Sequence, residues 1–264
     1  MKGKSPSGDC ITFLGTGGAR IVVANQILAS GGLWLNLSGT EILIDPGPGS
    51  IVQSTKRKLR ASNLSAIILS HRHLDHSADV NAMIEAMTQG GLKPHGRLFA
   101  PADALETEPV IFSYLKSYLE GIEILQAGKS YSIDNVSFTT PVRHIHPVET
   151  YGILFRTAEH TFSYIADSRY FDGLCHSYAS ELLIINVVFL EANHPFDHLS
   201  VPDARRIIVE VKPKVAILTH FGMSMWRAKP WQVAEGLSQQ TGVRVVAARD
   251  GMRFDLSQLA NSWG

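Results

Sequence analysis

Cysteine is nearly absent from this sequence, which has only Cys10 and Cys175 among its 264 residues. Two cysteines in a chain of this length do not make the disulfide framework that stabilises small secreted proteins. Apolar residues make up 45% of the chain, so a hydrophobic core can stabilise the fold without covalent cross-links. We therefore expect both thiols to be reduced, as in a cytoplasmic protein.

The chain also lacks an excess of charge, because 24 lysines and arginines balance 24 aspartates and glutamates. A net charge of zero argues against extended electrostatic binding of nucleic acid or of an anionic membrane. No apolar run reaches the roughly 20 residues that a membrane-spanning helix needs. Residues 1–6 include lysines, but no apolar segment follows them, so they do not resemble a signal peptide. The expected location is the cytoplasm.

Short apolar runs separated by glycine- and proline-rich turns predict many strands. Helical periodicity follows Asp75, a capping-box-like start at Ser200 predicts a second helix, and residues 230–239 predict a third. This order of elements indicates an α/β fold with two sheets inside and helices outside. We find no linker and predict one domain, residues 1–264. The predicted strands cover residues 11–14, 33–37, 41–44, 66–70, 136–140, 152–155, 162–165, 182–190 and 215–218.

The most informative segment is His71–His76, with the sequence HRHLDH, directly after a predicted buried strand. Imidazole and carboxylate groups are the usual ligands of zinc and similar divalent ions. His71 and His73 are two residues apart in extended chain, so their side chains leave on the same side. Asp75 and His76 fall in the first turn of the next helix, where adjacent side chains diverge by about 100°. The geometry favours two ions, with the first two histidines on one and the Asp-His pair on the other.

Further ligand-type residues follow three other predicted strands. Strand ends are where a sandwich displays its loops, so these side chains can meet the first segment. A carboxylate can bridge two cations, which a neutral imidazole does poorly. By position alone, either His144 or His146 could be the ligand. The residues are His144 and His146 after the strand at 136–140, Asp167 after the strand at 162–165, and His220 after the strand at 215–218.

The spacing His-x-His-x-Asp-His resembles the signature of the metallo-β-lactamase-fold metal-dependent hydrolases, and the resemblance covers nearly the whole chain. It implies a four-layer αβ/βα sandwich with the metal site at the edge of the two sheets. His146 lies six residues before Gly152, as the third ligand does in the ribonuclease Z-like and cyclic-phosphodiesterase-like branch, so His144 would lie behind the ligands or face the substrate. The resemblance assigns His71, His73 and His146 to one metal, Asp75, His76 and His220 to the other, and Asp167 to both.

Several positions bear on the substrate. Asp167 stands where thiol-ligand β-lactamases have Cys, and His73 stands where diiron flavoproteins have Glu, so we expect neither activity. His198-Leu199-Ser200 resembles an element of ribonuclease Z whose histidine assists at the phosphate, although a histidine here could instead bond a loop. Asn186 stands where that enzyme has an accompanying Glu. The segment between His146 and Asp167 is too short for an inserted tRNA-gripping arm.

The resemblance therefore implies hydrolysis of a small cyclic or nucleotide-type phosphodiester by a bridging hydroxide at a dinuclear site. Asp75 and His198 are the expected catalytic residues, with His198 stabilising charge or protonating the leaving oxygen. Asp45, in a Gly/Pro-rich loop, is the expected hydrogen-bond partner of a ligating histidine. Two divalent ions are expected, with zinc preferred and manganese or iron as alternatives.

Other functions remain open. Hydrolysis of a thioester or lactone would use the same ligands and cannot be separated by them. A non-catalytic nucleic-acid-binding protein is disfavoured, because no ligand is missing and the net charge is zero. The expected partner is a small-molecule or nucleotide-type substrate, with no membrane contact, and a homodimer is compatible with the sequence. We expect the glycine-rich segment 15–18 to form a tight turn beneath the site rather than a phosphate cradle.

Overall fold

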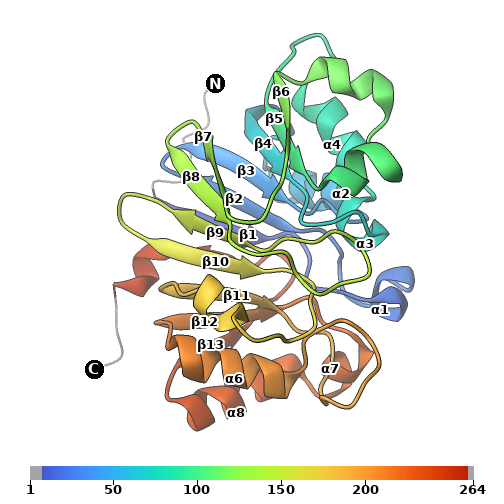
Figure 1. The fold of residues 1–264 in the computed structure, drawn as a ribbon. Helices are drawn as coiled ribbons and strands as arrows, with labels where there is room; N and C mark the ends of the chain where they lie inside the picture. Colours follow the sequence, from blue (N-terminus) through green and yellow to red (C-terminus); the bar gives the residue numbers. More distant parts are fainter. Residues whose placement is uncertain (1–7, 261–264) are drawn as a thin grey trace.

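The computed structural model describes residues 8–260, which form two seven-stranded mixed sheets packed face to face (Figure 1). The first sheet has the order β14 (Arg253–Asp255), β1 (Cys10–Phe13), β2 (Leu33–Leu37), β3 (Thr40–Ile44), β4 (Leu64–Ile68), β5 (Arg97–Ala100) and β6 (Gly121–Ile124). The second has the order β13 (Arg244–Ala247), β12 (Val215–Thr219), β11 (Leu182–Asn186), β10 (Thr161–Ile165), β9 (Ile153–Arg156), β8 (Val136–Thr140) and β7 (Lys129–Ile133).

Both faces of each sheet are covered, so the central strands are apolar at almost every position. In β3, Ile42 and Ile44 point into the core between the sheets, whereas Leu43 points outward into a second core. In β11, Ile184 joins the core between the sheets and Ile185 joins a third core on the opposite face. Alternation of side chains along each strand therefore explains why three separate cores form.

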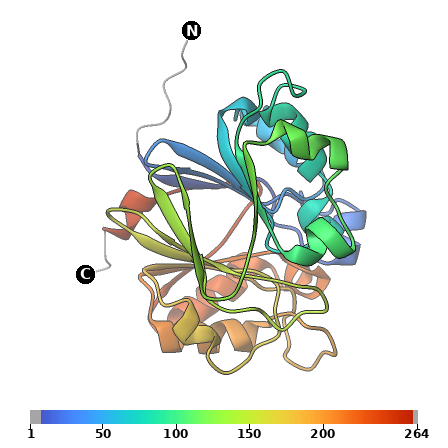
Figure 2. The same ribbon diagram turned by 45° about the horizontal axis from the view of Figure 1, so that its top comes forward.

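Helices form the two outer layers, as Figure 2 shows. The first sheet is covered by α4, whose buried residues all join the core on that face, and the second is covered by α5, α6 and α8. No helix among residues 8–260 is long and apolar enough to cross a membrane. The helices are α1 (Arg20–Ala24), α2 (Ser50–Lys56), α3 (Leu74–Ser77), α4 (Val80–Met87), α5 (Leu174–Ser177), α6 (Val201–Val211), α7 (Met223–Arg227) and α8 (Pro230–Thr241).

The predicted fold class, an α/β four-layer sandwich, is confirmed. The capping box at Ser200 is also confirmed: its side chain accepts a hydrogen bond from the backbone of Asp203, and the Asp203 side chain accepts from the backbone of Ser200. One predicted strand is too long. The run 182–190 leaves the sheet after Asn186, because the chain there turns into the loop that carries His198.

Five strands were not predicted, and one of them, β6, lies in the segment 101–125. β5, β6, β7, β13 and β14 span three to five residues each, and several alternate little between apolar and polar positions. The rest of the 101–125 segment holds a π-helical turn at Asp103–Thr107 and a 3-10 helix at Ser113–Tyr118. Short elements of this kind form through pairing with neighbours distant in sequence, which periodicity does not reveal.

Candidate metal centre

The ligand-type residues predicted from the sequence lie together at one edge of the two sheets, near α3 in Figure 1. β4 ends at Ile68, and the chain passes directly into the segment His71–His76. Asp167 lies two residues after β10 and His220 one residue after β12. His146 lies in the loop between β8 and β9 rather than at a strand end, because β8 already stops at Thr140.

Three imidazoles, from His71, His73 and His146, form what we term the first cluster. Nδ1 of His73 lies 3.1 Å from Nε2 of His71 and 3.0 Å from Nε2 of His146. The other nitrogen of His146 faces the backbone oxygen of Asp197 at 2.9 Å, so it carries the hydrogen and Nε2 is left as a donor atom for a metal. Burial lowers the pKa of all three histidines, so the neutral rings that a metal ion requires are favoured.

Asp75, His76 and His220 form the second cluster. Nε2 of His76 lies 2.9 Å from Nε2 of His220, and Oδ2 of Asp75 lies 3.4 Å from the same nitrogen of His220. Burial alone would lower the pKa of His76, but the carboxylates of Asp167, Asp75 and Asp45 raise it well above its usual value. Carboxylates therefore surround the second cluster, whereas the first cluster consists of imidazoles alone.

Asp167 lies between the two clusters. Its Oδ2 is 3.4 Å from Nε2 of His76 and 3.9 Å from Nε2 of His71, and the side chain is 1% exposed. Burial alone would raise the pKa of this carboxyl, but the imidazoles of His220 and His76 hold it well below its usual value. An ionised carboxylate in this position can contact one cation in each cluster.

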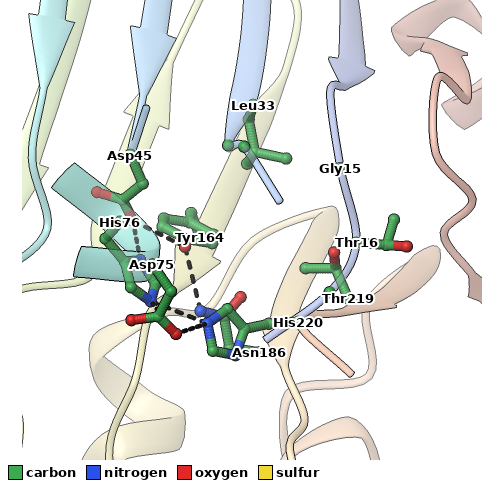
Figure 3. Close-up of a pocket in the computed structure, with 13 residues that line it drawn as sticks. Gly15, Thr16, Leu33, Asp45, Asp75, His76, Tyr164, Asn186, Thr219 and His220 are labelled. Atoms are coloured by element: carbon green, nitrogen blue, oxygen red, sulfur yellow. Dashed lines mark hydrogen bonds and ion pairs between the residues drawn. The ribbon is translucent and has the colours of Figure 1, made fainter. Parts of the chain in front are cut away.

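Asp45 supports the second cluster from behind, as Figure 3 shows. Its Oδ2 lies 3.0 Å from Nδ1 of His76 and accepts hydrogen bonds from the hydroxyls of Ser70 and Tyr164, at 2.7 and 2.9 Å. Its Oδ1 accepts from the backbone N–H of Ser70 at 2.6 Å. A hydrogen on Nδ1 of His76 then directs Nε2 toward the cluster. Asp45 is thus a hydrogen-bond partner of His76, one of the predicted ligands.

His144 is buried behind the site and does not face the opening. Its Nδ1 lies 3.1 Å from the backbone oxygen of Asp167, and its Nε2 lies 2.8 Å from the hydroxyl of Tyr178. Burial lowers the pKa of His144 to about 4. A neutral His144 therefore holds the backbone of Asp167 in place, whereas the neighbouring His146 joins the first cluster.

The glycine-rich turn lies directly beneath His220. A Cβ atom added to Gly18 would be 2.0 Å from Nδ1 of His220, closer than two non-bonded atoms can approach. The backbone N–H of Gly18 donates to the oxygen of Phe221, and that of Phe221 donates to the oxygen of Thr16. The sequence predicted a tight turn here, but the contact with His220 could not be foreseen, because the two segments are about 200 positions apart.

His198 lies beside both clusters. Its Nδ1 is 3.4 Å from Oδ2 of Asp167, and its ring centre is 5.2 Å from that of His146 and 6.4 Å from that of His220. The side chain is 19% exposed, so a bound molecule can reach it. Burial lowers the pKa of His198, and the neutral ring is favoured at pH 7.

The donor set fits divalent metal ions. The ligand-type atoms within each cluster lie within 4.8 Å of one another, so one ion could collect them. Each supporting contact described above leaves a nitrogen or oxygen directed inward. Sequence reasoning did not identify Tyr164 as a neighbour of this site, because a tyrosine in an apolar strand reads as a core residue.

The sequence matches the Beta-lactamase superfamily domain over residues 40–221. It is 32% identical to the protein MJ1374 of Methanocaldococcus jannaschii over 256 residues, which cover 93% of this chain and 94% of that protein. It is 27% identical to YhfI of Bacillus subtilis, described as a probable metallo-hydrolase, with 80% of this chain and 86% of YhfI covered. It is also 30% identical to ribonuclease Z of Methanosarcina mazei, with 47% of this chain and 42% of that enzyme covered.

Solved structures agree with the sequence comparisons. The crystal structure of YhfI superposes with a TM-score of 0.79 at 23% identity and covers 94% of this chain and 100% of YhfI. A diphosphatase of the PhnP family superposes with a TM-score of 0.71 at 20% identity, covering 94% of this chain and 97% of that one. The matched residues, 40–221, include every residue of the two clusters and Asp167. The chain therefore belongs to the metallo-β-lactamase superfamily and is a hydrolase of a metal-dependent family.

Proposed function

We propose that this protein hydrolyses a small phosphodiester, cyclic or nucleotide-type, with two divalent metal ions held by the first and second clusters. The position of His198 is the observation that carries the choice of a phosphodiester. Among residues 8–260, it is the one partly exposed histidine that contacts Asp167 without being part of either cluster. A hydrogen-bond donor at this point can reach an oxygen of a substrate held between the clusters.

The chain's own residues supply orientation and charge stabilisation. Bound metal ions would lower the pKa of a coordinated water, so that a nucleophile exists at neutral pH. Asp167 would hold the two ions at a fixed separation, and Asp45 would fix the ring of His76. Because the lowered pKa of His198 favours its neutral form, this ring acts by donating a hydrogen bond to the oxygen on which charge develops, rather than by transferring a proton.

The border of the site supports a small substrate rather than an RNA chain. Arg72 pairs with Asp103 at 3.0 Å and with Glu108, and Arg169 pairs with Asp197 at 2.7 Å, so these arginines are already neutralised. Leu74 and Ile145, which flank cluster residues in the sequence, are 74% and 46% exposed. A polyanion gains little from such a border, whereas an apolar ester group can pack on it.

Zinc is the metal that we propose, with manganese and iron as alternatives, since imidazole and carboxylate ligands accept all three. A cytoplasmic location, a single domain and a homodimer stay predictions.

The test is a His198→Ala variant, compared with His176→Ala, which changes an 84% exposed histidine on α5. The phosphodiester turnover of His198→Ala should fall by about 100- to 1,000-fold, as for the loss of one hydrogen-bond donor to developing charge. The metal content should stay the same in both variants. Bis-aryl phosphodiester, cyclic nucleotide, thioester and lactone substrates would be screened with metal-loaded protein. An unaltered phosphodiester rate in His198→Ala, or a faster rate on thioesters or lactones than on any phosphodiester, would contradict the proposal.

A further inference from the structure

Four buried side chains behind the second cluster form a continuous chain of hydrogen bonds, and Figure 3 shows three of them. Tyr164, on β10, donates to Oδ2 of Asp45 at 2.9 Å. Asn186, the last residue of β11, donates from Nδ2 to the hydroxyl of Tyr164 at 3.1 Å and to Oδ1 of Asp167 at 2.8 Å. The chain runs from Asp45 at the end of the first sheet to Asp167 at the end of the second, and each member is at most 4% exposed.

The direction of each hydrogen bond is fixed. A tyrosine hydroxyl has one hydrogen, and Tyr164 gives it to a carboxylate, so toward Asn186 it can only accept. The amide of Asn186 has two hydrogens and uses one on Tyr164 and one on Asp167. With the amide reversed, its oxygen would face a carboxylate and a hydroxyl that has no hydrogen left to donate. No other orientation of Asn186 satisfies both neighbours.

We propose that Tyr164 and Asn186 are positioning residues. They hold Asp45, behind the second cluster, and Asp167, between the two clusters, in fixed positions relative to each other. The amide occupies Oδ1 of Asp167 and leaves Oδ2 for the metal ions. The hydroxyl holds Asp45 in the position where it fixes the ring of His76. A carboxylate at position 186 could not donate either bond when ionised, so the asparagine is a requirement of this arrangement. This inference rests on the proposed function, because it assumes that the clusters bind metal.

Asn186 also lines a small cavity between the sheets of about 20 Å³, beside His76 and His220 (Figure 3). Its Oδ1 has no hydrogen-bond partner among residues 8–260. A cavity of this volume has room for one water molecule, the kind of partner that a buried carbonyl oxygen needs. The two amide hydrogens are used on Tyr164 and Asp167.

The test uses Tyr164→Phe and Asn186→Leu, which remove the bonds while nearly conserving volume. The matched control is Tyr131→Phe, because Tyr131 is also buried and its hydroxyl bonds the backbone of Ile124 and Gln126. Zinc affinity, measured in competition with a chelating indicator, should fall about 10- to 100-fold in each test variant and stay within twofold in the control. Visible absorption of Co²⁺-loaded protein, which reports ligand geometry, should change in the test variants only.

The double variant Tyr164→Phe/Asn186→Leu should lose no more affinity than the worse single variant, because both changes break the same chain. Wild-type zinc affinity in Tyr164→Phe, an equal loss in Tyr131→Phe, or additive losses in the double variant would overturn the inference. If Asn186→Leu does not fold, Tyr164→Phe alone decides the affinity and the spectrum. These measurements need no substrate, so a failure to find phosphodiester hydrolysis leaves them valid. A wild-type protein that takes up no metal would overturn both proposals.

Discussion

The two sheets contribute to the metal centre in different ways. The first sheet supplies four ligand-type side chains from one continuous segment, His71–His76, and side chains hold them: Asp45 contacts His76, and Ser70 contacts His71. The second sheet supplies His146, Asp167 and His220 from three separate loops. His146 faces a backbone oxygen and His220 packs on a glycine without a side chain, whereas Asp167 is held by the side chains of Asn186 and His144.

This difference decides which supports can be predicted from the sequence. A side chain that supports a ligand through its own functional group can be recognised by its residue type. A backbone oxygen is present at every residue, so its contact with a ligand depends only on where the fold places it. The predictions below test how strongly the centre depends on each kind of support.

Asp167→Asn should have the largest effect, because Asp167 lies between the two clusters and faces both. The amide keeps the shape of the side chain but loses the negative charge that faces both clusters. It also has one accepting oxygen instead of two, so it cannot both accept the hydrogen bond from Asn186 and present a second oxygen to the clusters. We expect loss of metal from both clusters and a decrease in turnover on the order of 1,000-fold or more. Elemental analysis and steady-state kinetics check this. Retention of one full equivalent of metal would show that the two clusters bind independently.

Gly18→Ala should have the next largest effect and should act on the second cluster alone. The new Cβ atom would lie 2.0 Å from Nδ1 of His220, and the backbone hydrogen bonds that join Gly18 and Thr16 to Phe221 hold the turn in place. His220 must therefore shift. A misplacement of about 1 Å at a reacting centre can cost roughly 100-fold in rate, which is the expected decrease. Metal content should fall, with the first cluster still occupied.

The control for this variant is Gly236→Ala. Gly236 lies within α8, and a Cβ atom added there has no neighbour within 4 Å. This change should leave the rate unaltered and should raise the free energy of unfolding by about 0.5–1 kcal/mol, because alanine is the better helix former. If Gly18→Ala behaves like its control, the turn does not position His220.

Residue types and spacing alone identified the ligands of the first sheet more completely than those of the second. The spacing of His71, His73, Asp75 and His76 indicated ligands because four such residues within six positions rarely occur by chance. The choice of His146 over His144 came from the spacing to Gly152, and the residues alone left both open. Contacts such as Gly18 with His220, or Tyr164 with Asp45, join segments more than 100 positions apart. One sequence carries no record of such pairs, so they became visible only in the folded chain.

His144 allows a test of the second-sheet support through pH. Its pKa is about 4 in the folded protein and near 6.5 in the unfolded chain. The unfolded chain therefore binds a proton that the folded protein refuses, so stability is present above pH 6.5 and is lost as pH falls toward 4. Between pH 7 and pH 5 this one group should remove about 2 kcal/mol.

Urea unfolding of metal-free wild type and of His144→Gln at both pH values measures this contribution. Glutamine keeps a donor and an acceptor but takes up no proton, so the variant should lose about 2 kcal/mol less than wild type on acidification. Other histidines titrate in both proteins and cancel in the difference. An equal loss in the two proteins would mean that His144 is not held neutral behind Asp167.

Asp197→Ala should have the smallest effect, although this residue contacts a proposed ligand as closely as Asp45 does. Nδ1 of His146 faces the backbone oxygen of Asp197 at 2.9 Å, and alanine keeps that oxygen. The side chain of Asp197 pairs with Arg169, which is 55% exposed, and an ion pair of this kind contributes at most about 1 kcal/mol. Turnover should therefore change less than about threefold. In Asp45→Ala, by contrast, the carboxylate itself is the support, and zinc affinity should fall about 10- to 100-fold. Measuring both variants side by side tests the comparison directly: if Asp197→Ala were as damaging as Asp45→Ala, His146 would depend on the side chain of Asp197 and not on its backbone oxygen.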